Sequence, residues 1–169
     1  MIGDFSARGA MRPCPTLRGL APDPLLGKGS RYERSKKMKI EKIEHIGIAV
    51  KSIDDATKFY EGILNLKLTE KIEVPQRKIR IVFVEVSETK LELLESMEEG
   101  SVIDKFIQKK GEGIHHICFE VEDFDKVVVE LKSKKMELLD EPRTGAEGKK
   151  IVFLQPKNAF GVLIELKEK

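Results

Sequence analysis

The sequence predicts an α+β fold in which two tandem βαβββ modules form a cup. Three observations lead to this fold class. An internal repeat relates residues 43–50 to residues 114–121. Each half of the repeat starts with an alternating strand pattern and continues with a helix pattern. Both halves then end in short runs rich in Ile and Val, which are typical of strands.

The repeat extends beyond its first segment. IEHIGIAV at 43–50 aligns with IHHICFEV at 114–121 at an offset of 71 residues. Three further anchors follow in the same order: 53–54 with 124–125, 81–84 with 151–154 at an offset of 70, and 91–93 with 164–166 at an offset of 73. Nearly constant spacing over four anchors indicates a duplicated unit of about 55 residues.

The first module, over 38–95, is expected to hold one helix and four strands. The alternating strand lies at 43–50, and a helix over 53–62 follows with Ser52 as its N-cap. The remaining strands are expected at 66–74, 78–86 and 90–95.

The second module, over 113–169, repeats this order after a linker at 96–112. Ser101 can cap a short amphipathic helix in the linker. A strand at 114–121 and a helix at 123–135 come next. The last strands are expected at 136–140, 149–155 and 161–167, with a loop over 142–148.

Residues 1–37 differ from the rest in charge and pattern. They carry eight Lys and Arg against three acids, a net charge of +5, so the remainder carries −3. With five Gly, four Pro and no apolar periodicity, they are predicted to be a disordered extension from a start codon placed too early. An organellar presequence is the less favoured alternative, and a secretory signal is excluded because no continuous apolar run follows the first basic residues.

Composition excludes several functional classes. A net charge of +2 argues against nucleic acid or an anionic membrane as the partner. No apolar run reaches the ~20 residues of a membrane span. The two cysteines, Cys14 and Cys118, form no disulfide framework. With 40% hydrophobic and 36% charged residues, a soluble cytoplasmic globular protein is expected.

In a strand, the side chains of neighbouring residues point to opposite faces of the sheet, so alternate positions can be assigned to the same face. The apolar residues of the first strands are predicted to face the helices (Ile46, Ile48, Val50, Ile117, Phe119 and Val121). His45 and His116 then lie on the opposite face, whereas Glu44 and His115 fall on the helix side. Flanking leucines and isoleucine turn Glu92 and Glu165 away from the apolar face in the same way.

Two modules related by a pseudo-twofold axis bring these polar faces together. His45, Glu92, His116 and Glu165 are therefore predicted to converge in one cleft. Two imidazoles and two carboxylates suit a first-row divalent metal such as Co, Mn, Ni, Zn or Fe. Such a site leaves coordination positions for water or substrate, as catalysis requires. His115 is expected to be a packing residue or a support behind the ligands.

Four segments carry a family resemblance: 44–50 (EHIGIAV), 113–121 (GIHHICFEV), 145–157 (GAEGKKIVFLQPK) and 161–166 (GVLIEL). Over about 40–167 the sequence resembles the vicinal oxygen chelate superfamily, which includes glyoxalases, and within it the methylmalonyl-CoA epimerase family. The resemblance implies metal ligation at His45, His116 and Glu165. It places Glu92 at a fourth ligand position, where the family has Glu or Gln.

The resemblance also implies a reaction. Interconversion of (R)- and (S)-methylmalonyl-CoA needs a proton removed from C2 and one returned to the opposite face, through an enediolate that a divalent cation stabilises. Co²⁺ is the expected ion, with Mn²⁺, Ni²⁺ and Zn²⁺ as alternatives. Glu165 is implied as the acid/base on one face. The stretch 79–83 has no carboxylate for the other face, and Gln76 and Arg80 are its polar neighbours. A one-base mechanism or a base from another element stays open.

The partners implied are a small acyl-CoA and a second copy in a homodimer. Arg143, Lys149 and Lys150 are candidate phosphate contacts, with solvated loop charge as the simpler explanation for each. Three alternatives remain: a glyoxalase I-type lactoylglutathione lyase, an extradiol dioxygenase and a non-catalytic small-molecule-binding protein of the same fold.

Overall fold

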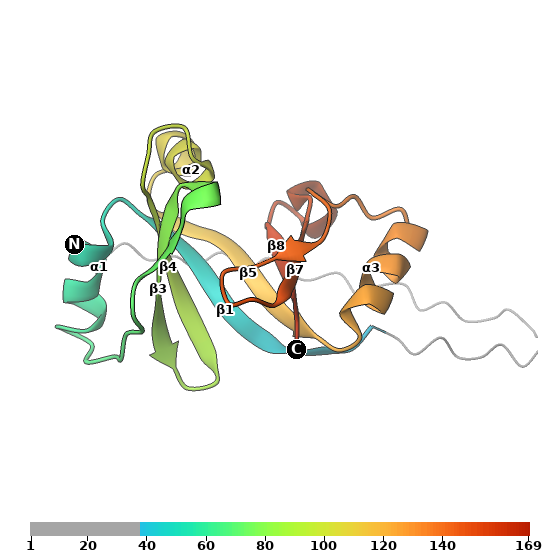
Figure 1. Cartoon of the computed structure of the whole chain (residues 1–169), viewed down its shortest axis with the longest axis horizontal. Coiled ribbons are helices and arrows are strands. Elements are labelled where there is room, and N and C mark those ends of the chain that lie inside the picture. Colours follow the sequence, from blue (N-terminus) through green and yellow to red (C-terminus); the bar gives the residue numbers. More distant parts are fainter. Residues whose placement is uncertain (1–37) are drawn as a thin grey trace, which may run out of the picture. The chain divides into compact units, whose positions relative to one another are not determined.

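The computed structural model of the chain describes residues 38–169 (Figure 1). The extension predicted over 1–37 lies outside the described residues. The predicted boundaries of the two modules, at 38–95 and 113–169, stay a prediction.

Eight strands form one mixed sheet in the order β2-β3-β4-β1-β5-β8-β7-β6. The antiparallel pair β1–β5 lies at its centre, and each of these two strands pairs in parallel with the last strand of its own half, β4 or β8. The eight strands are β1 (Ile40–Val50), β2 (Ile72–Val74), β3 (Ile79–Val86), β4 (Thr89–Ser96), β5 (Gly113–Val121), β6 (Arg143–Thr144), β7 (Lys150–Leu154) and β8 (Ile164–Glu168). The order is the same in both halves read outward from the centre, which confirms the predicted fold class.

Three helices pack on this sheet: α1 (Ile53–Tyr60), α2 (Val102–Lys110) and α3 (Phe124–Ser133). Figure 1 shows α1 beside β3 and β4 and α3 at the other end of the sheet. The predicted N-caps of α1 and α2 are confirmed, since Ser52 Oγ accepts from the Asp55 N–H at 3.2 Å and Ser101 Oγ accepts from the Asp104 N–H at 3.0 Å. Each cap satisfies a backbone donor that the first turn leaves unpaired.

The hydrophobic core lies on both faces of the sheet. Under α1, Ile53 packs with Val84 and Leu93, all fully buried. Under α3, the second half has the corresponding cluster around Val121 and Val152. A third cluster, around Ile103 of α2, covers part of the opposite face of the first half. These clusters confirm the predicted helix-facing side for Ile48, Val50, Phe119 and Val121. For Ile46 and Ile117, which belong to none of the clusters, it stays a prediction.

Two predicted strands are largely absent as regular elements. The segment 66–74 pairs with β3 at Leu68–Val84 and again at Ile72–Ile81, but the register shifts by one residue between the two contacts. The segment 136–140 keeps only an isolated pairing of Leu138 with Leu154. These segments lie at the edges of the sheet, where a shifted register leaves fewer ladder hydrogen bonds unmade than it would at the centre.

Smaller differences concern element ends. Helices α1 and α3 are shorter than predicted at their C-terminal ends, where the chain turns through left-handed residues at Asn65 (φ 55°) and Lys135 (φ 58°). The predicted loop 142–148 contains the two-residue strand β6, which pairs with β7.

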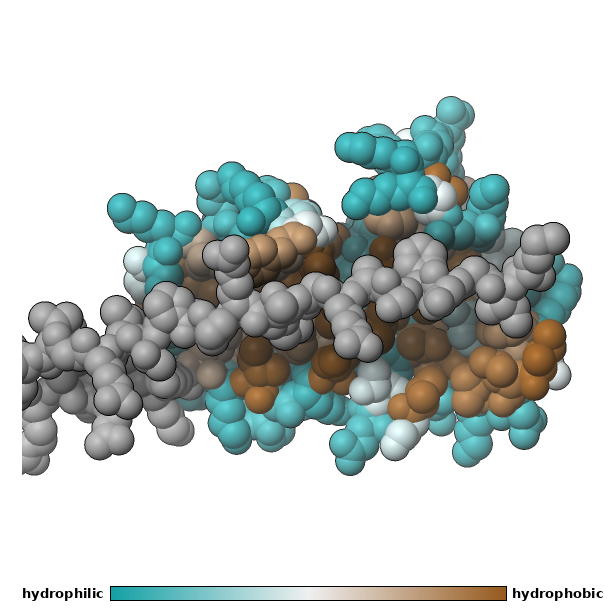
Figure 2. All heavy atoms as spheres, turned by 180° about the vertical axis from the view of Figure 1, so that it is seen from behind, coloured by the Kyte–Doolittle hydropathy of each residue, from teal (hydrophilic) through white to brown (hydrophobic). Residues whose placement is uncertain are grey.

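Some large apolar side chains remain exposed. Three of them, Phe59, Ile63 and Leu64, lie in and just after α1, and Figure 2 shows a hydrophobic surface at the end where α1 lies. No helix among the residues that the structure describes is long and apolar enough to cross a membrane.

Candidate metal centre

The two predicted histidines come from the central strands. In the antiparallel pairing of β1 with β5, His45 is opposite Cys118 and His116 is opposite Gly47. Each imidazole thus stands across from a small residue of the neighbouring strand. This arrangement leaves room for both rings on the same face of the sheet.

The two predicted carboxylates come from the strands that flank the central pair. Glu92 of β4 is the parallel partner of Gly47, and Glu165 of β8 is the parallel partner of Cys118. Alternation turns both carboxylates to the face that carries the imidazoles. Four strands therefore bring the four predicted side chains to the middle of the sheet.

The donor atoms of this cluster are mutually close. His45 Nε2 lies 3.0 Å from His116 Nε2, and Glu165 Oε2 lies 3.0 Å from His116 Nε2 and 3.5 Å from His45 Nε2. Glu92 Oε2 is 3.4 Å from both Nε2 atoms. All four residues are buried.

These separations fit one shared cation. Imidazole nitrogens and carboxylate oxygens bind first-row divalent metals at about 2.0–2.2 Å, which places neighbouring ligand atoms about 3.0–3.5 Å apart. His45, His116 and Glu165 also each offer a ligand atom within 4.8 Å of the others. A mixed nitrogen and oxygen donor set suits a divalent ion of the first transition row.

The charges of the cluster also favour a cation. Burial would lower the pKa of His45, but contacts with Cys118, Glu165 and Glu44 outweigh it and raise the pKa to about 12. Burial would raise the pKa of Glu165, but hydrogen bonds with His116 and His45 lower it to about 2. These contacts thus hold positive charge on the His45 imidazole, and a metal ion would replace its proton.

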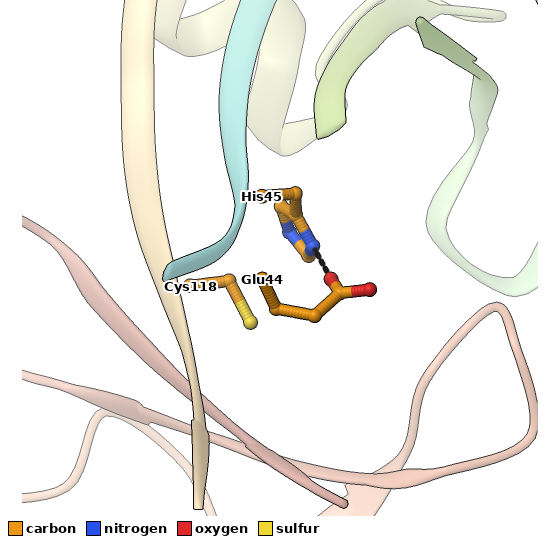
Figure 3. Close-up of side chains that lie close together, drawn as sticks. All are labelled: Glu44, His45 and Cys118. Atoms are coloured by element: carbon orange, nitrogen blue, oxygen red, sulfur yellow. Dashed lines mark hydrogen bonds and ion pairs between the residues drawn. The ribbon is translucent and has the colours of Figure 1, made fainter. Parts of the chain in front are cut away.

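Glu44 lies beside the cluster, although parity placed it on the helix side. That prediction was wrong because the β1–β5 register shifts between Ile43 and His45, and such a bulge turns two consecutive side chains to one face. The Glu44 carboxylate accepts a hydrogen bond from His45 Nδ1 (Figure 3). A carboxylate behind a ligating imidazole fixes its tautomer and orientation, so Glu44 is a support for His45 that sequence reasoning missed.

Cys118 is the third member of the group in Figure 3. Burial raises the pKa of its thiol to about 12. Because metals bind the thiolate, a thiol with this pKa is a packing neighbour of His45 at neutral pH.

His115 occupies the repeat-equivalent position of Glu44, and a bulge also reverses the face of its side chain. A second register shift, next to Gly47, turns its side chain away from the predicted helix side. Its Nδ1 lies 3.0 Å from Nδ1 of His116, and its ring packs edge-on against Phe106. Burial and the neighbouring His116 lower the pKa of His115 to about 4, so it is neutral at pH 7. Two adjacent polar residues inside an alternating strand were the available signal for both bulges.

Ion pairs close the outer side of His45. Glu44 Oε1 lies 3.0 Å from Lys167 Nζ and 3.1 Å from Lys90 Nζ. Both lysines also pair with Glu147, in the loop between β6 and β7. A cavity of only about 20 Å³ remains on this side, between His45 and the loop.

A large cavity opens on the other side of the cluster. Its volume is about 710 Å³, and His115, His116, Glu92 and Glu165 all line it. Its apolar walls come from both halves of the sheet and include Ile81, Leu94 and Phe153. A cavity of this size and character accommodates a small-molecule ligand, with the cluster at one end.

The other polar residues that the sequence analysis singled out lie outside the cluster, some in the wall of the large cavity and some on the surface. Arg143 and Gln76 line the large cavity. In contrast, Lys149 Nζ bonds the Lys169 carbonyl oxygen at 2.9 Å, and Lys150 Nζ pairs with Asp125 at 2.7 Å, at exposed positions. Arg80 Nε pairs with Glu73 at 3.1 Å. A neutral Gln76 amide cannot accept a proton at neutral pH, so the second acid/base group stays unassigned.

Comparison with known proteins agrees with this geometry. The family model of the glyoxalase/bleomycin resistance protein/dioxygenase superfamily matches residues 44–153. The match covers most of the part of the chain that the structure describes, including β5 and most of β1, the two central strands.

Comparison with individual proteins indicates the family within this superfamily. The human protein "Methylmalonyl-CoA epimerase, mitochondrial" is 37% identical over 99% of this chain and 93% of its own length. The crystal structure of methylmalonyl-CoA epimerase from Mycobacterium tuberculosis has a TM-score of 0.72 at 35% identity, covering 76% of this chain and 88% of that one. A structure of methylmalonyl-CoA epimerase with methylmalonyl-CoA and NH4+ has a TM-score of 0.71 at 33% identity, covering 78% and 96%. The chain belongs to the methylmalonyl-CoA epimerase family of this superfamily.

Proposed function

We propose that the chain is a metal-dependent epimerase that interconverts (R)- and (S)-methylmalonyl-CoA. The observation that carries this proposal is the buried cluster of two His and two Glu, three of which line a cavity of about 710 Å³. The names of the relatives support the acyl-CoA substrate. They do not favour the alternative, a glyoxalase I-type lyase.

The proposed metal ligands are His45, Glu92, His116 and Glu165. Co²⁺ is the proposed ion, with Mn²⁺, Ni²⁺ and Zn²⁺ as alternatives. When bound, the cation supplies Lewis-acid stabilisation of the charge that develops on the enediolate oxygens. Glu44 keeps the His45 ring in place through Nδ1, which leaves Nε2 directed at the other three donors.

Glu165 is the proposed acid/base at C2. Its carboxylate lines the large cavity, so it is within the space that an acyl group would occupy. Hydrogen bonds with His116 and His45 lower its pKa, so the carboxylate is ionised at neutral pH, the form that a proton acceptor needs. Inversion needs the proton to return to the opposite face, either from a second group or from Glu165 after rotation of the intermediate.

Deuterium exchange tests the proposal directly. The full chain, loaded with Co²⁺, is mixed with methylmalonyl-CoA in deuterated water, and mass spectrometry follows incorporation at C2. Exchange is expected with the metal and is expected to stop after chelation. No exchange with any of the four metals would overturn the assignment.

A variant pair tests the role of Glu165. Glu165→Gln keeps a metal-binding oxygen but removes the proton acceptor, so exchange is expected to fall by about 10²- to 10⁴-fold. Glu85→Gln changes an exposed carboxylate on β3 and serves as the control, with unchanged exchange. Equal exchange in the two variants would exclude Glu165 as the base.

Two further properties are proposals from the resemblance. A homodimer is proposed, and the exposed apolar side chains around α1 are consistent with a protein contact. Sedimentation equilibrium of the full chain would measure its mass. A cytoplasmic location stays a prediction.

A further inference from the structure

Two arginines line the large cavity and share one carboxylate. Arg77 follows β2, and Arg143 belongs to β6 at the other edge of the sheet. Asp140 Oδ2 lies 3.9 Å from Nη2 of Arg77 and 3.6 Å from Nε of Arg143. Both distances exceed hydrogen-bond length, so Asp140 holds the two guanidinium groups nearby without using their donors. Two positive charges facing one negative charge leave this part of the cavity wall cationic.

Arg143 is placed close to the metal cluster. Its guanidinium lies over the ring of Phe153, 5.1 Å from the centroid, and the other neighbour of that ring is His116, at 5.5 Å between centroids. The guanidinium and a proposed metal ligand therefore contact the same aromatic ring. Stacking on Phe153 also restricts the plane of the guanidinium.

Arg143 is partly exposed, with 23% of its side chain accessible, but two of its donor nitrogens are not. Its Nε and Nη1 atoms are buried and make no hydrogen bond. Leaving buried charged donors unsatisfied costs free energy, and an oxygen acceptor brought in by a ligand would recover it. Nε and Nη1 lie on different edges of the guanidinium, and each edge is shared with Nη2. A carboxylate or a phosphate can accept two parallel N–H···O bonds along one such edge.

We propose that Arg143, assisted by the charge of Arg77, recognises the free carboxylate of a 2-carboxyacyl thioester. This inference rests on the proposed function and names the residue that selects malonyl-type thioesters over simple acyl thioesters. The short path from Arg143 to His116 through Phe153 favours the acyl carboxylate over the CoA phosphates, which lie at the far end of the pantetheine arm. One carboxylate oxygen then faces the cluster and the other faces the guanidinium.

Binding of unreactive ligands tests this assignment. Malonyl-CoA carries the carboxylate and propionyl-CoA lacks it, so calorimetric titration of the Co²⁺-loaded chain with each isolates the carboxylate contact. Arg143→Gln is expected to weaken malonyl-CoA binding by on the order of 10- to 100-fold. Propionyl-CoA binding is expected to change less than about twofold. Arg143→Lys keeps the charge but lacks the planar guanidinium, so its affinity for malonyl-CoA is expected to lie between those of the wild type and Arg143→Gln.

The matched control is Arg80→Gln. Arg80 is also a strand arginine with carboxylate neighbours, Glu73 and Glu95, but it is not among the residues that line the cavity. Malonyl-CoA and propionyl-CoA are each expected to bind Arg80→Gln with the same affinity as the wild type. Equal weakening of both ligands by Arg143→Gln would mean a packing role and would overturn the proposal.

A third ligand separates carboxylate from phosphate. Malonyl-pantetheine retains the acyl carboxylate and has no phosphate, so Arg143→Gln is expected to weaken it as much as malonyl-CoA. Weakening confined to malonyl-CoA would assign Arg143 to a phosphate and overturn the proposal. These titrations do not depend on turnover. If no deuterium exchange occurs but Arg143→Gln still weakens malonyl-CoA binding, the epimerase assignment is overturned and the carboxylate site is retained.

Discussion

The substitution Gly47→Ala tests whether the central strands position the cluster. A Cβ atom built at Gly47 would lie 2.2 Å from Cε1 and 2.3 Å from Nδ1 of His116. Carbon atoms in contact are about 3.5–4.0 Å apart, so the ring would have to move by more than about 1 Å. His116 contacts Phe153, His45 and His115 and also lines the large cavity, so its ring would have to displace one of these neighbours or swing into the cavity.

Such a shift takes His116 Nε2 away from the other donors. In the unsubstituted protein, His116 Nε2 lies 3.0 Å from both His45 Nε2 and Glu165 Oε2. We expect Co²⁺ to bind Gly47→Ala at least about 10-fold more weakly. Turnover by the loaded enzyme is expected to fall by about 10², because misplacement by 1 Å costs this much at a catalytic site.

The assay is calorimetric titration with Co²⁺, combined with thermal unfolding to measure stability. Gly100→Ala is the control, because its Cβ would meet nothing within 4 Å although its φ is +80°. That substitution is expected to cost about 1–2 kcal/mol of stability and to leave metal affinity unchanged. A Gly47→Ala protein that folds and binds Co²⁺ as tightly as the wild type would refute the placement of His116.

Three further predictions concern the cluster and the core. His116→Ala is expected to lower Co²⁺ affinity by more than about 100-fold in calorimetry, and His115→Ala by less than about 10-fold; the reverse order would contradict the assigned faces. Glu44→Gln removes the charge behind His45 and is expected to weaken Co²⁺ by about 10- to 100-fold, whereas an unchanged affinity would exclude a supporting role. Val152→Ala removes two methyl groups from a fully buried site and is expected to cost about 2 kcal/mol in urea unfolding. The exposed Val129→Ala should cost under about 0.5 kcal/mol, and equal losses would be evidence against this core.

The convergence of four side chains was predictable from sequence because alternation and duplication are independent signals. Parity alone would have left His45 as one polar strand residue among several. The repeat singled out His116 as its equivalent, and Glu92 and Glu165 occupy matching positions in the last strands. The structure brings these four together because β1 and β5 pair through Ile46 and Ile117, which are themselves equivalent positions. A twofold relation through that pair places each histidine opposite the small residue of the other strand.

Parity failed where the backbone departs from alternation. Both bulges add one residue beside a ligand, so Glu44 and His115 turn to the face that carries their neighbours. Two adjacent polar residues in each strand mark where a bulge can occur, but the pairing of two strands that are distant in sequence decides whether it forms. The same reason explains the edge segments near Leu68 and Leu138, where β-propensity indicated a strand but the pairing register does not allow a continuous one.

The duplication gives the cluster a symmetric set of donors, but the residues behind them are not symmetric. His45 Nδ1 bonds a carboxylate, Glu44, whose charge two lysines balance, whereas His116 Nδ1 faces the neutral ring of His115. A carboxylate makes the imidazole it supports a stronger donor, so His45 should bind a metal more tightly than His116. The ion pairs also fill the space behind His45, leaving about 20 Å³, while the His116 side opens on 710 Å³. We therefore expect one half of the duplicated sheet to anchor the proposed ion, and the other half, which also contributes Arg143, to leave the space through which the proposed anionic substrate would reach it.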